Sequence, residues 1–146
     1  MYTNKIVQFA VVAAVAAVFA SATADTRAQQ AVPESRVVIQ VSDADPGKWN
    51  LALNNARNLQ TDLGAANVAI EIVAYGPGIG MLKADSVVGN RIGEALGAGV
   101  NIVACENTMR GQKLSKPDML HGIGYVGAGV VEIMRRQQEH WSYLRP

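Results

Sequence analysis

The chain has 146 residues, which is enough for one domain with a single core. Hydrophobic residues make up 49% of it and charged residues 17%, a balance that favours a packed domain over a disordered chain. The formal net charge is +1, and no basic patch with interleaved aromatic residues is visible. We therefore expect no nucleic-acid partner.

The N-terminal segment has the features of an export signal. Lys5 supplies a positive start, an uncharged apolar run extends from Ile6 to Ala20, and Ala22-Thr23-Ala24 matches a small-x-small cleavage pattern. The run is 15 residues long, shorter than the roughly 20 that span a bilayer as a helix. We expect residues 1–24 to be a signal peptide and the protein to be periplasmic, without membrane contact after cleavage. An uncleaved N-terminal anchor is the alternative.

The first half of the remaining chain reads as leader, strand, helix and strand. Residues 25–35 are polar and aperiodic, as in a flexible leader, and the domain is expected at residues 36–146. The β-branched run at 36–41 predicts a buried strand. Asp45 followed by Pro46 predicts a helix start, and Gly64 predicts its end. The apolar residues at helical spacing between them are Trp49, Ala52, Leu53, Ala56, Leu59 and Leu63.

A glycine-rich segment follows the second predicted strand, Val68–Tyr75. It contains Gly76, Gly78 and Gly80, but its glycine spacing fits neither a dinucleotide fingerprint nor a nucleotide P-loop. A sharp turn is the simpler interpretation, although glycines also let a ligand approach the backbone closely. We expect no bound cofactor.

The second half continues the alternation. It predicts a helix at 86–97, a strand at 100–105, a short helix capped by Asn107 or Thr108, a turn capped by Ser115, a weak strand at 123–126, a helix from 128 and a short final strand at 142–145. In the last helix the inward residues are expected to be Val130, Ile133, Met134 and Trp141, and the outward residues Glu132, Arg135, Arg136 and Glu139. The whole pattern predicts an α/β domain with a mostly parallel sheet of four to five strands and helices on both faces.

Cys105 is the only cysteine, so it cannot form an internal disulfide. It stands where a strand ends and a helix begins, a position at which backbone N–H groups and the helix dipole favour thiolate over thiol. We expect its sulfur to face solvent at the mouth of the sheet, with Arg110 favouring the thiolate and Glu106 opposing it. The alternative is that Cys105 is a small hydrophobic residue that caps a buried strand.

Other catalytic or metal centres have little support. His121 and His140 are far apart in the sequence, and one cysteine does not complete a zinc site with them, so no metal is expected. No G-x-S-x-G motif of a serine hydrolase is present.

Several segments resemble the DsrE/DsrF-like family: Val103-Ala104-Cys105-Glu106-Asn107-Thr108-Met109-Arg110-Gly111, then Leu114-Ser115, the stretch from Gly127 to Gln137, and the terminal Tyr143-Leu144-Arg145-Pro146. The resemblance implies a flavodoxin-like α/β sandwich that forms homo- or hetero-oligomers, often trimers or hexamers. In the sulfur-relay members it also implies a cysteine after the third strand that accepts a persulfide, and Cys105 has that place here. Glu106 and the export signal depart from the pattern expected of those members.

These observations predict a protein that carries sulfane sulfur as a persulfide on Cys105. Asn107, Thr108 and Arg110 would stabilise the anion, and Tyr75, Gly76 and Gly78 would form the opposite lip of the site. The expected partners are a sulfur donor or acceptor protein, or a small sulfane-sulfur compound, and the chain is expected to form a homo-oligomer, a trimer or a hexamer. The alternative is a non-catalytic oligomeric module that binds a small ligand or a partner, with Cys105 buried and inert.

Overall fold

The computed structural model of the chain describes Pro33 and residues 35–146. The predicted signal peptide and most of the predicted leader lie outside these described residues. Within the described part, no helix is long and apolar enough to cross a membrane.

Strands and helices alternate along the described chain. In order they are β1 (Ser35–Val41), α1 (Pro46–Leu63), β2 (Val68–Ala74), the 3-10 helix η1 (Gly76–Leu82), α2 (Gly89–Gly97), β3 (Asn101–Cys105), α3 (Glu106–Gly111), the 3-10 helix η2 (Lys116–Asp118), β4 (Gly124–Val126), α4 (Gly129–Gln138) and β5 (Ser142–Leu144). The five strands form one parallel sheet in the order β4-β3-β2-β1-β5. The predicted α/β class, with a flavodoxin-like parallel sheet, is confirmed.

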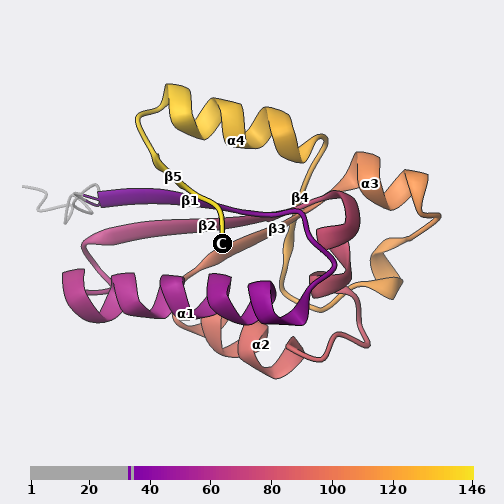
Figure 1. The fold of residues 1–146 in the computed structure, drawn as a ribbon, viewed down its shortest axis with the longest axis horizontal. Helices are drawn as coiled ribbons and strands as arrows, with labels where there is room; N and C mark the ends of the chain where they lie inside the picture. Colours follow the sequence, from indigo (N-terminus) through magenta and orange to yellow (C-terminus); the bar gives the residue numbers. More distant parts are fainter. Residues whose placement is uncertain (1–32, 34) are drawn as a thin grey trace, which may run out of the picture. The chain divides into compact units, whose positions relative to one another are not determined.

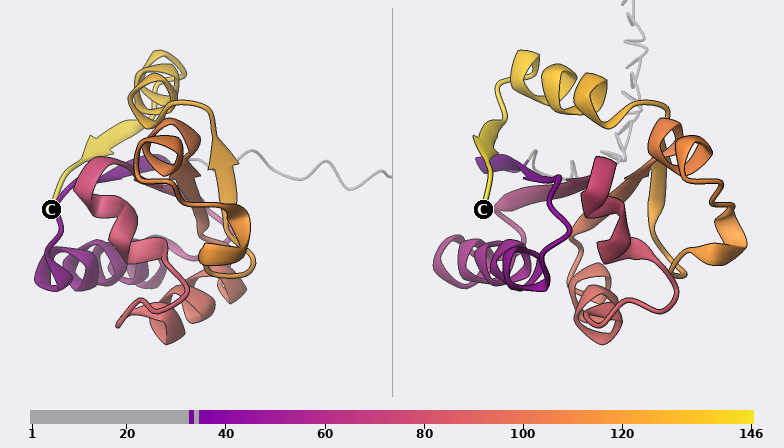
Figure 2. Two further views of the ribbon diagram at one scale, coloured as in Figure 1. Left: turned by 90° about the vertical axis from the view of Figure 1, so that its right-hand side faces the viewer. Right: turned by 45° about the vertical axis from the view of Figure 1, so that its right-hand side comes forward.

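Helices cover both faces of this sheet, as Figures 1 and 2 show. Parallel crossovers are right-handed, so connections that step in one direction across a sheet lie on one face. The steps from β1 to β4 all run in one direction, and α1 and α2 lie together on one face. The return from β4 to β5 runs in the opposite direction and carries α4 to the other face.

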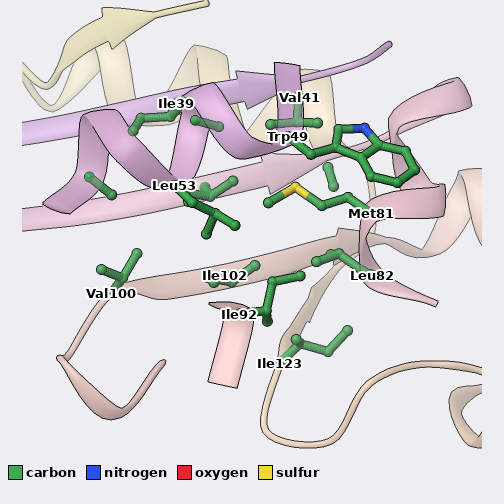
Figure 3. Packing of buried hydrophobic residues seen from close by; sticks show 14 of the residues in the cluster. Ile39, Val41, Trp49, Leu53, Met81, Leu82, Ile92, Val100, Ile102 and Ile123 are labelled. Atoms are coloured by element: carbon green, nitrogen blue, oxygen red, sulfur yellow. The ribbon is translucent and has the colours of Figure 1, made fainter. Parts of the chain in front are cut away.

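The larger core lies between the sheet and the α1/α2 layer (Figure 3). Helix α1 begins as predicted, because the Asp45 carboxylate accepts a hydrogen bond from the Gly47 N–H at 2.8 Å. Its buried residues are Trp49, Ala52, Leu53 and Ala56, which confirms most of the predicted apolar face. Leu63, at the last position of the helix, is instead 42% exposed.

The core under α4 is much smaller. Its buried residues are Val38, Val73, Val103 and Ile133. The inward face predicted for α4 is wrong in part, because Val130 and Met134 are 57% and 51% exposed, whereas Glu132 is buried. Burial of one Ile133 side chain contributes only about 1.5–3 kcal/mol, so this helix needs a further attachment to the sheet.

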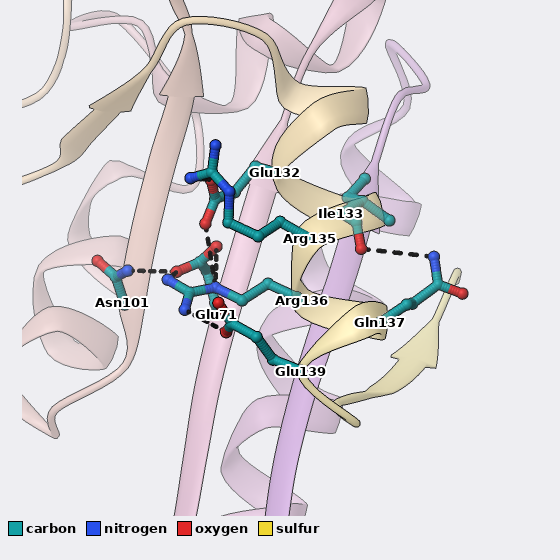
Figure 4. A network of polar contacts seen from close by, with 8 residues as sticks. All are labelled: Glu71, Asn101, Glu132, Ile133, Arg135, Arg136, Gln137 and Glu139. Carbon is teal, nitrogen blue, oxygen red and sulfur yellow. Dashed lines mark hydrogen bonds and ion pairs between the residues drawn. The ribbon is translucent and has the colours of Figure 1, made fainter.

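That attachment is a polar network around Glu71, a residue of β2 that is 1% exposed (Figure 4). The Glu71 carboxylate accepts hydrogen bonds from Arg136 of α4 at 2.7 and 3.2 Å and from the Asn101 side chain of β3 at 2.6 Å. Arg136 also pairs with Glu132 at 3.0 Å. A buried carboxylate must be paired, and this requirement turns Arg136 inward against the prediction, while Glu132, also predicted to point outward, is buried beside Arg136.

Two segments differ locally from the predictions. The glycine-rich segment after β2 is the 3-10 helix η1 instead of a simple turn, and α2 begins at Gly89 instead of at 86. Gly78 of η1 lies against the end of β1, where an added Cβ would stand 2.3 Å from the Val41 carbonyl oxygen. Glycine is needed there for close packing of backbone on backbone.

Candidate functional site

Cys105 is the last residue of β3 and lies beside Val126 of β4 in the parallel register. Side chains alternate between faces along a strand, so Cys105 points to the same face as Val103, the face that α4 covers. After β3 the chain enters α3, whose Met109 joins the core on the α1/α2 side. After β4 it enters α4 on the opposite side. When the connections after two neighbouring strands go to opposite faces of the sheet, a crevice forms at the carboxyl ends of those strands. Ligands usually bind in this crevice in such sheets.

The thiol sulfur is held by backbone amides from both of these helices. The Thr108 N–H of α3 lies 3.5 Å from Cys105 Sγ, and the Gly129 N–H at the first position of α4 lies 3.3 Å from it. The predicted caps of α3, Asn107 and Thr108, are wrong, because the helix begins at Glu106 and the Cys105 side chain is its cap. A sulfur in this position receives two donors and the positive ends of two helix dipoles.

Thr108 adds a side-chain contact to this pair. The Thr108 side chain lowers the pKa of Cys105, and its oxygen accepts a hydrogen bond from the Gly76 N–H at 2.9 Å. The Gly76 carbonyl in turn accepts from the Gln112 side chain at 3.2 Å. The Gly76 N–H therefore anchors the Thr108 side chain next to the start of α3.

Tyr75, which follows β2, packs against the start of α4 at Gly129. An added Cβ on Gly129 would stand 3.0 Å from the Tyr75 Cβ and 3.2 Å from its ring. The absence of a side chain at Gly129 lets Tyr75 pack directly on the backbone that donates to Cys105. The predicted residues Tyr75, Gly76 and Thr108 are thus brought together with Cys105.

The electrostatic balance at Cys105 has two opposed parts. Burial raises the pKa of the thiol, whereas hydrogen bonds from the Thr108 side chain and from the Gly129, Thr108 and Asn107 backbone lower it, and the net effect is a pKa below the ordinary value. The sulfur does not face solvent as predicted, since Cys105 is only 4% exposed. The buried sulfur nevertheless has hydrogen-bond donors around it, which a cysteine that serves only as a small hydrophobic residue at a strand end does not require.

The other predicted residues lie at the rim or away from the site. Arg110 is exposed, and its guanidinium donates to the Asn107 side chain and not to Cys105. Gly78 packs on β1, as described above. Asn107 lines a surface groove whose other residues are Tyr125, Val126, Gly127, Ala128, Val131, Glu132 and Arg135. The groove borders Val126, the strand neighbour of Cys105.

Gly129 is the site residue that the sequence predictions missed. The available signal was a glycine at the start of a helix, in Gly127-Ala128-Gly129, where an exposed amide and a close approach to a neighbour go together. As for metals, the described residues contain no cluster of three or more His, Cys, Asp or Glu side chains that could hold an ion.

The chain is similar in sequence and structure to MTH1491 from Methanobacterium thermoautotrophicum, a protein of unknown function. The two are 40% identical, the match covers 77% of this chain and 99% of MTH1491, and the TM-score is 0.73. This chain belongs to the MTH1491 family. No protein-family model matches it, and no match is found among curated proteins.

Two further solved structures share the fold of this chain at lower sequence identity to it. BT1422 from Bacteroides thetaiotaomicron is 18% identical with a TM-score of 0.64, and the match covers 77% of this chain and 95% of BT1422. YchN from E. coli is 16% identical with a TM-score of 0.58, and the match covers 77% of this chain and 99% of YchN. These likenesses relate the chain to a wider group at the level of the fold.

Proposed function

We propose that this protein carries sulfane sulfur as a persulfide on Cys105. The observation that carries the proposal is the pair of helix N-terminal amides on Sγ, the Thr108 N–H at 3.5 Å and the Gly129 N–H at 3.3 Å. Amide donors of this kind stabilise an anionic sulfur, whether it is the thiolate or the ionised persulfide. The resemblance of the sequence to the DsrE/DsrF-like family supports the same function.

The chemistry needs only a persulfide donor. The Cys105 thiolate attacks the outer sulfur of a donor R–S–SH, a new S–S bond forms at Cys105, and the S–S bond of the donor breaks. The electron pair leaves with R–S⁻, which takes a proton from water. Sulfur changes carrier without net oxidation, so no cofactor is consumed. Transfer to an acceptor thiolate is the same step in reverse.

Because the site is closed, a sulfur donor also needs a route to the Cys105 sulfur. Cys105 is 4% exposed, so a donor must displace part of the cover formed by Tyr75 and the segment that leads into α4. The groove that contains Asn107 and Val126 leads to this cover, and we propose it as the route of approach.

Mass spectrometry of protein treated with inorganic polysulfide tests the carrier function. The wild type should gain the mass of one sulfur atom, mapped to the peptide that contains Cys105, and dithiothreitol should remove it. Cys105→Ser should remain unmodified. An unmodified wild type under conditions that modify free cysteine would contradict the proposal.

The burial of Cys105 favours one rival, a non-catalytic oligomeric module that binds a ligand or partner and has an inert thiol. The two functions differ in thiol labelling of the native protein. The carrier predicts labelling of Cys105 in the folded state. The module predicts labelling that becomes appreciable only when the protein unfolds.

We further propose that the chain acts as a homo-oligomer, a trimer or a hexamer, after export to the periplasm and removal of residues 1–24. Exposed apolar side chains of α4 outside that groove support self-association, since Val130 and Met134 are 57% and 51% exposed. Sedimentation velocity should show an oligomer that Met134→Glu disrupts, and N-terminal sequencing of the exported protein should begin at Asp25. A monomeric wild type or an intact N-terminus would contradict the corresponding part.

A further inference from the structure

Helix α4 is attached to the sheet in an unusual way. Its buried residues are Gly129, Glu132 and Ile133, so Ile133 is its only buried apolar side chain. Helix α1 buries four residues that are all apolar. The position of α4 therefore depends on polar contacts to a degree that the position of α1 does not.

The contacts that meet this need converge on Glu71 and Arg136 (Figure 4). Arg136 uses Nη2 and Nε on the Glu71 carboxylate, Nε again on Glu132 at 3.0 Å, and Nη1 on Glu139 at 3.2 Å. Its guanidinium carbon also lies 4.6 Å from the centre of the Trp141 ring. We call the Glu71–Arg136 pair the clamp.

The clamp and the Cys105 contact are the two ends of one rigid element. Gly129 and Arg136 are seven residues apart, about two helical turns or roughly 10 Å, and lie on the same side of α4. A helix of this length moves as a body. A tilt or slide that breaks the clamp therefore changes the 3.3 Å contact between the Gly129 N–H and Cys105 Sγ.

We propose that the clamp is a positioning device for Cys105, which holds the Gly129 N–H against the sulfur from the far end of α4. Glu71 and Arg136 are thus positioning residues that touch neither the sulfur nor its donor. The inference deepens the proposed function, because it concerns the same thiol. It is tested on the thiol itself and not on sulfur transfer, so either can fail alone.

The test is the far-ultraviolet absorbance of the thiolate as a function of pH. Because Cys105 is the only cysteine, subtracting the titration of Cys105→Ser isolates its signal. The variants are Glu71→Gln and Arg136→Met, and the control is Arg135→Met, which removes a cation from the same helix without touching Glu71. The Arg135 side chain is 59% exposed and pairs only with Glu132 at 3.2 Å.

Positioning and simple charge predict opposite signs at Glu71. If the clamp positions the donor, both Glu71→Gln and Arg136→Met raise the titration midpoint and lower the ratio of thiolate to thiol by about tenfold, the worth of one hydrogen bond to a charged group. Arg135→Met then leaves the midpoint unchanged. If only charge matters, Glu71→Gln lowers the midpoint, because it removes an anion, and both arginine variants raise it.

The proposal would be overturned by a lowered midpoint in Glu71→Gln, as charge alone predicts, or by unchanged midpoints in both clamp variants. Glu71→Gln is the milder change, since glutamine keeps the shape of the side chain, and circular dichroism verifies the fold of each variant. Wild-type sulfur uptake with unchanged midpoints in the variants would refute the clamp and leave the carrier function in place. Raised midpoints in both clamp variants without sulfur uptake in the wild type would refute the carrier function and leave the clamp in place.

Discussion

Thr108 links the glycine-rich segment after β2 to Cys105, and replacing it by valine tests that link. Valine has nearly the shape of threonine, so the change removes the hydroxyl and little else. Two contacts are lost together: the acceptor for the Gly76 N–H at 2.9 Å, and the side-chain hydrogen bond to the thiol. The Thr108 N–H on Sγ is a backbone contact and remains.

The two losses have separate magnitudes. An N–H left without its acceptor costs about 1–3 kcal/mol, and Gly76 is partly exposed, so the lower end applies to the unfolding free energy. A hydrogen bond to a charged group contributes about 1.5–3 kcal/mol, so the ratio of thiolate to thiol in Thr108→Val should fall at least about tenfold. The pKa of Cys105 thus moves toward that of an ordinary thiol.

Iodoacetamide alkylation against pH and urea unfolding measure these two effects. The alkylation midpoint should rise in Thr108→Val, and the urea midpoint should fall. Thr108→Ser keeps the hydroxyl and serves as the matched control, with both midpoints near those of the wild type. If Thr108→Val and Thr108→Ser alkylate with the same pH midpoint, the hydroxyl does not act on the sulfur.

Three further results are expected. Gly129→Ala puts a Cβ 3.0 Å from the Tyr75 Cβ and should cost about 1–3 kcal/mol of unfolding free energy in urea, whereas Gly127→Ala, whose added Cβ meets nothing within 4 Å, should be neutral; equal effects would refute the close packing. Gly93→Ala, in the exposed interior of α2 with nothing near the added Cβ, should raise thermal stability by about 0.5–1 kcal/mol, and a loss would show a contact that the structure lacks. Burial and the nearby Glu71 charge raise the pKa of Glu132 above 4.5, so the folded state holds this proton more tightly than the unfolded chain, and stability should fall as pH rises from about 4.5 through the raised folded value. Glu132→Gln should remove that fall in a urea series across acidic to neutral pH, and an unchanged slope would contradict the assignment.

The parts of the fold that follow from apolar patterning could be predicted from the sequence. The β-branched runs that became β1 and β3 are buried, and the three- and four-residue spacing from Trp49 to Ala56 marks the inner face of α1. Asp45 acts as the expected cap, and Ser115 forms a capping box with Asp118. In each case the deciding interaction lies within a few residues of the signal.

The inner face of α4 could not be predicted in this way. Its orientation is set by Glu71, which lies 65 residues before Arg136 in the chain and is the only charged residue of the otherwise apolar strand β2. Hydropathy places Val130 and Met134 inside and Arg136 outside, and the long-range pairing of a buried carboxylate reverses that order.

The site was only partly predictable for a similar reason. The position of Cys105 at a strand end and the proximity of Tyr75, Gly76 and Thr108 follow from parallel strands that end at one edge. The hydrogen-bond donor Gly129 lies 24 residues after Cys105 in the chain, and its position depends on where α4 begins after β4. The packing of Tyr75 on that glycine is likewise a contact between distant parts of the chain, which no local pattern encodes.

The most direct test of the account compares the thiolate titration of the native protein with that of the same protein unfolded in urea. Amide and side-chain donors outweigh the effect of burial on the pKa of Cys105, so the native midpoint should lie below the unfolded one. A native midpoint above the unfolded one would mean that burial dominates, and Cys105 would then be an inert thiol in a folded module.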